Sequence, residues 1–157
     1  MRKRIIGQGP PEVLAAEPGW LEIEGSARVE ITSEEAGFPI ESALIPGTGP
    51  GWRAAQPGEQ TIRLLFDEPL TLRRIHVVFH EDEQERTQEF VLRWSPDAGR
   101  TYRDIVRQQY NFSPPGATRE VEDYSLDLDG VTALELKINP DISGGDARAS
   151  LARLRIA

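Results

Sequence analysis

The chain has 157 residues, with 26 acidic and 18 basic side chains, a net charge of -8 and no cysteine. This length predicts one domain with a sizeable core, and the missing cysteines exclude disulfides and thiolate chemistry. The negative charge repels phosphate backbones, so we expect no nucleic-acid partner. No apolar run is long enough to span a bilayer, and no apolar segment follows the basic start. We therefore expect no membrane contact and a cytoplasmic location.

Apolar and polar residues alternate along most of the chain after residue 20. Gly, Pro, Asp and Asn separate these runs, which is typical of an all-β, antiparallel β-sandwich or jelly roll. We expect an N-terminal arm, 1–19, and a single β-sandwich domain, 20–157. The candidate strands are Trp20–Glu24, Arg28–Thr32, Gln60–Phe66, Leu72–His80, Thr87–Ser95, Tyr102–Phe112, Arg119–Leu126, Ala133–Ile138 and Ala149–Ile156. Short helical turns are expected only at 10–17 and Pro39–Leu44.

The stretch from Gln88 to Tyr102 is the most informative part of the sequence. The face of this strand that we expect to point into the core carries Gln88, Phe90, Leu92 and Trp94. The strand ends in Ser-Pro-Asp-Ala-Gly, where Pro presets φ, Asp bonds its own backbone and Gly is free to take positive φ. A tight turn is therefore predicted before the chain restarts at Tyr102.

This turn resembles the Ser-x-Asp-Gly-x-x-Trp hairpin of the discoidin-like, or galactose-binding-like, jelly rolls of the coagulation factor C type. Ser95, Asp97, Gly99 and Tyr102 stand at the matching places. Three further segments carry the resemblance: Ala43–Trp52 with Gln60–Phe66, Leu72–Phe79, and Ala147–Ile156. The resemblance implies a jelly roll that binds carbohydrate or a small polar ligand without catalysis, at the loop end of the sandwich. The alternative that it allows is an intracellular protein-docking or structural module.

Many members of that family hold a structural calcium ion, with an acidic residue before the Trp and a Glu in the closing strand. Here the loop 44–51 has no carboxylate, and the closing strand offers Arg153 and Arg155. Calcium needs several oxygen ligands and formal negative charge. We therefore expect no metal and no cofactor, with Pro46 and Pro50 fixing the loop instead.

The acidic segment from His80 to Arg86 admits three interpretations. A solvated loop between two strands is favoured over a metal or acid–base site, because one flexible loop seldom fixes ligands from several directions. The third interpretation follows the sugar-binding relatives, and it makes His80, Glu81 and Arg86 ligand-binding candidates, since planar charged groups bond vicinal hydroxyls. Arg86, with its five-donor fork, is the residue that we expect to hold a polar ligand.

Aromatic and amide side chains supply the remaining candidates. Tyr110, Asn111 and Phe112 offer stacking faces and hydrogen bonds for a sugar, although Tyr110 and Phe112 also share one strand face and are favoured as core residues. Trp52 is favoured as a core or rim residue, but it and Arg53 are kept as candidates, because Arg53 could stack on Trp52 or Trp52 could lie at a loop base. The loops 45–54, 81–86 and 111–117 are expected at one end of the sandwich, because alternate antiparallel connections emerge together.

Catalysis has no support in the sequence. There is no cysteine, no Gly-x-Ser-x-Gly turn, and both histidines lie on one predicted strand. The glycines of segment 47–51 have no Lys among them and lead into a strand, so they do not form a phosphate loop. We therefore expect a binding protein that is not an enzyme.

Overall fold

The computed structural model describes residues 19–47 and 49–157, so nearly all of the predicted arm and the helical turn at 10–17 lie outside the described residues. Within them are eight strands and one short helix. They are β1 (Ala27–Ile31), α2 (Glu41–Leu44), β2 (Trp52–Pro57), β3 (Gln60–His80), β4 (Arg86–Ser95), β5 (Arg103–Phe112), β6 (Arg119–Asn139), β7 (Arg148–Leu151) and β8 (Arg153–Ile156). The all-β class is confirmed, and α2 confirms the turn expected at Pro39–Leu44.

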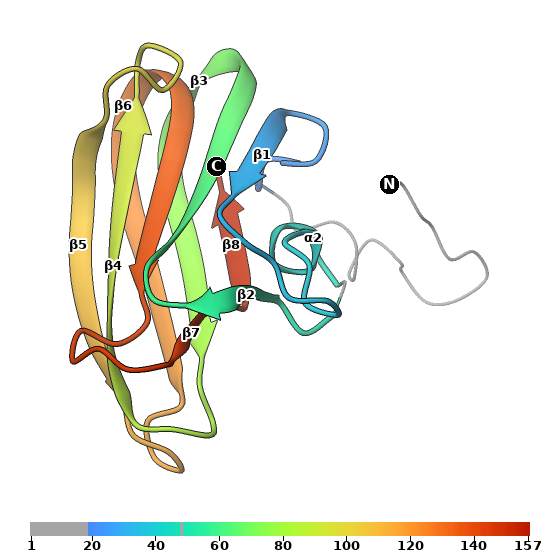
Figure 1. Ribbon diagram of the computed structural model, residues 1–157. Coiled ribbons are helices and arrows are strands. Elements are labelled where there is room, and N and C mark those ends of the chain that lie inside the picture. The colour runs from blue at the N-terminus through green and yellow to red at the C-terminus, as the bar shows by residue number, and fades with distance from the viewer. Residues whose placement is uncertain (1–18, 48) are drawn as a thin grey trace.

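Two long strands, β3 and β6, create both layers of the sandwich. Each has 21 residues, and they pair antiparallel from Gln60↔Ile138 to His80↔Arg119, with register shifts around Leu65–Arg74. Figure 1 shows both strands arching over at the top of the molecule, so that one half of each lies in the first layer and the other half in the second. The sequence predicted four separate strands here; the interruptions at 67–71 and 127–132 are instead bends within continuous strands.

The first layer, called here the β4 layer, has the order β1–β3–β6–β4–β5. The second layer holds the other halves of β3 and β6 with β8, while β2 and β7 pair beside it. Phe79 of the second layer contacts Phe90 of β4, with ring centroids 5.0 Å apart. The core therefore lies between the two layers, and the apolar face predicted for β4 points into it, with Phe90 and Leu92 fully buried and Trp94 9% exposed.

Two strand predictions are wrong, and one strand was missed. Segment 20–24 forms a bend and a turn, with one backbone bond from Leu21 N–H to Ile156 O. The predicted closing strand is split at Ala152 into β7 and β8, which pair with different strands. Strand β2 was not predicted, because it contains Pro57 and the small residues Ala54 and Ala55, which are uncommon in strands. No helix in the described part of the chain is long and apolar enough to cross a membrane.

The Ser-Pro-Asp-Ala-Gly turn forms as predicted. Ser95 Oγ accepts hydrogen bonds from the N–H groups of Asp97 (3.2 Å) and Gly99 (2.9 Å), and it donates to Asp97 Oδ1 (2.7 Å). Gly99 has φ of 86°. The turn folds Tyr102 back over the outer face of the β4 layer, where its ring lies 5.5 Å from the Arg93 guanidinium carbon.

Candidate functional site

Arg86, the residue expected to hold a ligand, is buried, and its Nε and Nη1 bond other groups of the protein. It is 3% exposed. Its Nε donates to Glu81 Oε1 (2.7 Å), and its Nη1 donates to Pro140 O (2.8 Å) and Gln88 Oε1 (3.2 Å). The ring of Phe112 covers its other side. The expectation of a ligand on Arg86 is therefore corrected: its donors join the loops 81–85 and 140–147 to β4.

The other acidic-loop candidates are also constrained. Glu81 accepts bonds from Arg86 and from the N–H groups of Glu83 (3.0 Å) and Gln84 (3.4 Å). Burial raises the pKa of Glu81, but these hydrogen bonds outweigh burial, so its pKa is lowered overall. His80 is exposed at the end of β3. Among the described residues, no three His, Asp or Glu side chains gather closely enough to hold a metal ion.

The aromatic candidates of β5 pack rather than present a stacking platform. Phe112 is fully buried and meets Tyr110 edge-on, with centroids 5.0 Å apart. Tyr110 donates its hydroxyl to Arg119 O (3.0 Å). Asn111 points the other way, as alternation requires, and accepts a bond from Thr87 Oγ1 (2.6 Å). Stacking of a sugar on Phe112 is thus excluded by burial, and the core interpretation is the better one.

Trp52 and Arg53 lie apart from these loops. Trp52 is 1% exposed, pairs with Leu151 of β7 and donates Nε1–H to Ser33 O (3.0 Å). Arg53 lies over the ring of Phe38 (4.3 Å), not over Trp52. Glu81 N–H bonds Thr118 O (2.8 Å), and Arg86 lies opposite Phe112, so segments 81–86 and 111–117 are neighbours, as expected. Residues 45–54, apart from 48, contact α2 and β7 instead, through Gly51.

A polar hollow lies instead on the outer face of the β4 layer, with a volume of about 360 Å³. Its lining comes from β4, β5, β6 and the residue before β3: Glu59, Glu89, Val91, Arg93, Asp104, Arg107, Lys137 and Asn139. Cross-strand register arranges most of them in rows, since residues directly opposite on adjacent strands are neighbours. The middle row runs Arg107, Val91, Lys137 across β5, β4 and β6. Val91 is the short side chain in that row, and the long side chains around it form the walls.

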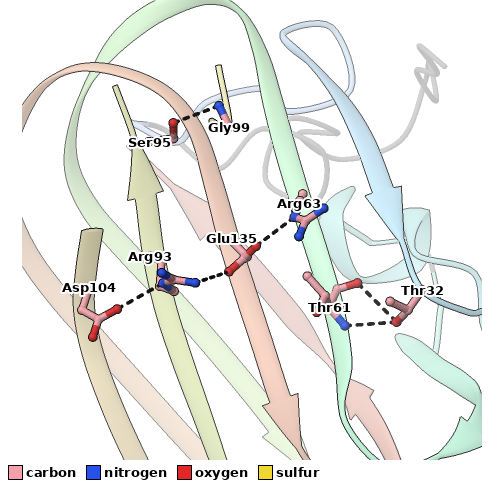
Figure 2. A network of polar contacts seen from close by, with 8 residues as sticks. All are labelled: Thr32, Thr61, Arg63, Arg93, Ser95, Gly99, Asp104 and Glu135. Carbon is pink, nitrogen blue, oxygen red and sulfur yellow. Dashed lines mark hydrogen bonds and ion pairs between the residues drawn. The ribbon is translucent and has the colours of Figure 1, made fainter. Parts of the chain in front are cut away.

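The next row runs Asp104, Arg93, Glu135 across β5, β4 and β6, and its side chains form a charged network (Figure 2). Glu135 is 1% exposed and accepts bonds from Arg63 Nε (2.8 Å) and Arg93 Nη1 (3.3 Å). Arg93 Nε also donates to Asp104 Oδ1 (3.1 Å). The hydrogen bond to Glu135 raises the pKa of Arg63. Because the four charges bind one another, this side of the hollow is fixed in one geometry.

A second hollow of about 270 Å³ adjoins the first, because Glu59 and Asn139 line both. Its remaining lining is Gly58 and the loop 140–147, including Gly144, Gly145 and Ile142. Ile142 is 46% exposed, so an apolar side chain stands at this end of the groove. We call the two together the double hollow. It offers hydrogen-bond donors and acceptors around small apolar surfaces, which suits a ligand with many hydroxyls.

Inside the sandwich, Glu120 is a buried acid outside the double hollow. It is 1% exposed, and its Oε1 accepts a bond from Gln88 Nε2 (3.2 Å). Burial, followed by the hydrogen bond and the negative charge of Glu122, raises the pKa of Glu120 to about 8. With the carboxyl group ionised, its Oε2 has no hydrogen-bond partner among the described residues. A protonated Glu120 resolves this, because its hydroxyl can donate to Glu122.

Sequence reasoning did not identify the double hollow. The alternation that puts Phe90 and Leu92 in the core leaves Glu89, Val91 and Arg93 on the opposite face of β4, which is where the structure has them. What it lacked was the register that sets Arg107 and Lys137 on either side of Val91. The available signal was the alternation of charged residues on the three strands, but pairing partners are not visible in a single sequence.

No protein-family model matches the chain, and no curated protein sequence matches it. Solved structures do. The family 32 carbohydrate-binding module of NanJ from Clostridium perfringens, in complex with galactose, is 12% identical with a TM-score of 0.63, over 87% of this chain and 96% of that one. A module of a Clostridium perfringens glycoside hydrolase, solved with GalNAc-β-1,3-galactose, is 16% identical (TM-score 0.59, coverage 87% and 98%).

A third structure, the family 32 module of AlyQ with 4,5-unsaturated mannuronic acid, is 13% identical (TM-score 0.60, coverage 84% and 95%). These likenesses span most of both chains in each case. The resemblance read from the turn at Ser95–Tyr102 is thereby confirmed at the level of fold: the chain has the discoidin-like, galactose-binding-like jelly-roll fold.

Proposed function

We propose that this protein is a non-catalytic carbohydrate-binding module that takes its ligand in the double hollow. One observation carries the proposal. In the middle of the β4 layer, the aliphatic side chain of Val91 is surrounded by side chains that donate and accept hydrogen bonds. A sugar has the same pattern, with apolar C–H faces and a rim of hydroxyls. Solved proteins of the same fold that are named for binding galactose, GalNAc-galactose and a uronic acid support it.

The rigidity of the site supports binding further. Glu135 holds Arg63 and Arg93, while Glu89 holds Arg107 Nη1 (2.8 Å) and Gln109 Nε2 (2.9 Å). Side chains that are already ordered lose little conformational entropy when a ligand arrives. The same pairing argues against acid–base catalysis, because these carboxylates are ion-paired acceptors.

The protein-docking alternative would need a contiguous apolar surface. Among the described residues, the large apolar side chains that are clearly exposed are Val121 and Ile142, both at 46%. Val121 is on the second layer and Ile142 is in the loop after β6, so they form no common patch. Single exposed apolar residues are ordinary. Carbohydrate binding is therefore the function that we favour.

A cytoplasmic location stays a proposal that cell fractionation would test.

The decisive experiment fills the floor of the hollow. Val91→Arg puts a long cation where the sugar would lie, and Val91 is outside the main core cluster. Val121→Arg is the matched control, since it makes the same change on the second layer. We expect sugar titrations followed by NMR to show binding by the wild type and Val121→Arg, and none by Val91→Arg. A wild type that binds no galactose, GalNAc or uronic acid would refute the proposed function, whereas binding by Val91→Arg would move the site elsewhere.

A further inference from the structure

The charges of the first hollow do not all have partners. Arg93 is paired with Asp104 and Glu135, and Arg107 is paired with Glu89. Lys137 is different: within residues 19–47 and 49–157, its ammonium group makes no hydrogen bond or ion pair. Its side chain is nevertheless only half-exposed, in a strand at the middle of the layer. The hollow thus contains an unneutralised cation next to its floor.

The register places this cation precisely enough to predict a ligand contact. Lys137 lies directly opposite Val91, and Val91 lies directly opposite Arg107 on its other side. Adjacent strands are about 4.8 Å apart, so the side chains of Arg107 and Lys137 leave the sheet about 5 Å from Val91, one on each side. One of them already bonds Glu89, and the other is free. The arrangement is suited to an apolar ring face over the Val91 methyls with one anionic group at its edge, beside Lys137.

We infer that the double hollow selects a sugar that carries a carboxylate, with Lys137 binding the carboxylate and Val91 supporting the ring. The inference rests on the proposed function, because it names the class of sugar for the same site. A sugar acid has both parts that the geometry requires, an apolar ring face and a single negative charge at its edge. A bond between an ammonium group and a carboxylate is stronger than one between neutral groups.

The overall charge of the chain acts against anions only at long range. The net charge is -8, but its field is screened over about 10 Å at moderate salt. Within that distance the hollow is close to neutral, because three acidic and three basic side chains line it. Among the residues that the structure describes, Lys137 therefore acts as a single unpaired cation beside Val91. Glu59, which is exposed on the rim shared by the two hollows, is the nearby carboxylate without a partner among the described residues. It is placed to accept a hydrogen bond from a hydroxyl group of a ring bound in the second hollow.

Galactose and galacturonate form a matched pair of probes, because they differ only in a hydroxymethyl group and a carboxylate. NMR titration of the wild type should give an affinity for galacturonate about tenfold higher than for galactose, the usual scale of a charged hydrogen bond. Raising the salt concentration should reduce this ratio. Lys137→Met should bring the ratio to about one, and Lys137→Arg should retain most of it.

Arg28→Met is the control, since it also removes a cation from the layer but from the exposed edge strand β1, where the side chain is 72% exposed. The ratio should be unchanged in this variant. Equal affinity of the wild type for both sugars, or an unchanged ratio in Lys137→Met, would overturn the inference while leaving the proposed function intact. Binding of neither sugar would overturn the inference, and a further failure to bind GalNAc would overturn the proposed function as well. Urea unfolding of each variant confirms that the fold is present during the titrations.

Discussion

Arg86 and Phe112 form a stacked pair at the end of β4 and β5, with the guanidinium carbon 4.7 Å from the ring centroid. They are also direct cross-strand partners in the sheet. The pair closes the loop end of the core, because the outer atoms of the guanidinium bond Glu81 and Pro140 while its face covers the ring.

Arg86→Ala should therefore destabilise the fold by about 3 kcal/mol, since it leaves Glu81 unpaired and exposes Phe112. Arg107→Ala is the matched control, because Arg107 forms an ion pair from a side chain that is 60% exposed, and it should cost less than about 1 kcal/mol. Urea denaturation followed by tryptophan fluorescence measures both. A stable Arg86→Ala variant would restore Arg86 as a ligand-binding candidate.

Glu120 should make the protein less stable at alkaline pH. Its pKa is raised from 4.5 in the unfolded chain to about 8 in the fold. Its contribution to stability is therefore complete below about pH 4.5 and is lost as the pH rises through about 8, because the unfolded chain releases the proton first. We expect the free energy of unfolding to decrease across this range.

Glu120→Gln should remove that part of the pH dependence, because an amide does not titrate and can still donate to Glu122. Glu122→Gln should retain part of it, since burial is the largest cause of the raised pKa. Unfolding curves of the three proteins at a series of pH values test this. Parallel pH profiles for the wild type and Glu120→Gln would contradict a protonated Glu120.

Gly51→Ala should be more harmful than Gly58→Ala. Both glycines have positive φ, 97° and 87°. A Cβ at Gly51 would lie 2.6 Å from Leu151 O, in the backbone of β7, whereas a Cβ at Gly58 meets nothing within 4 Å. We expect a loss of about 1 kcal/mol for Gly58→Ala from the left-handed backbone alone, and at least about 2 kcal/mol for Gly51→Ala. Equal losses of stability in the two variants would show that β7 shifts to accommodate the new Cβ at residue 51.

Asp97 should stabilise the fold at neutral pH, and this stabilisation should be lost in acid. Hydrogen bonds from the Thr101 side chain and backbone, and then from Ser95, lower its pKa from 3.8 to about 2. The stabilisation is present above about pH 3.8 and is lost as the pH falls through about 2. Asp97→Asn should flatten this acid limb in unfolding experiments. Asp104→Asn serves as the comparison, and an identical acid limb in Asp97→Asn would contradict the assignment.

The sequence predicts what depends on local pattern. Alternation identified β4 and its buried face, and the Ser95–Gly99 turn was correct to the residue because Pro, Asp and Gly each have one conformational role there. Prediction from the sequence failed where the structure depends on contacts between segments that are distant in the chain. Arg86 has the residue type of a ligand-binding group, yet the loop 140–147 comes from far along the chain to bury it. The hollow beside Lys137 depends on the register of three strands, which no single strand encodes.

The continuity of β3 and β6 through both layers has a consequence for how the protein opens. A sandwich of two independent sheets can separate at its interface, but here each layer shares backbone with the other through two covalent bends. Breaking the backbone pairs between β3 and β6 near Gln60 therefore weakens the pairs near His80, because both sets belong to the same two strands. We expect the amide hydrogens of β3 and β6 to exchange with solvent deuterium only through global unfolding, while those of β1 and β2 exchange by local fraying.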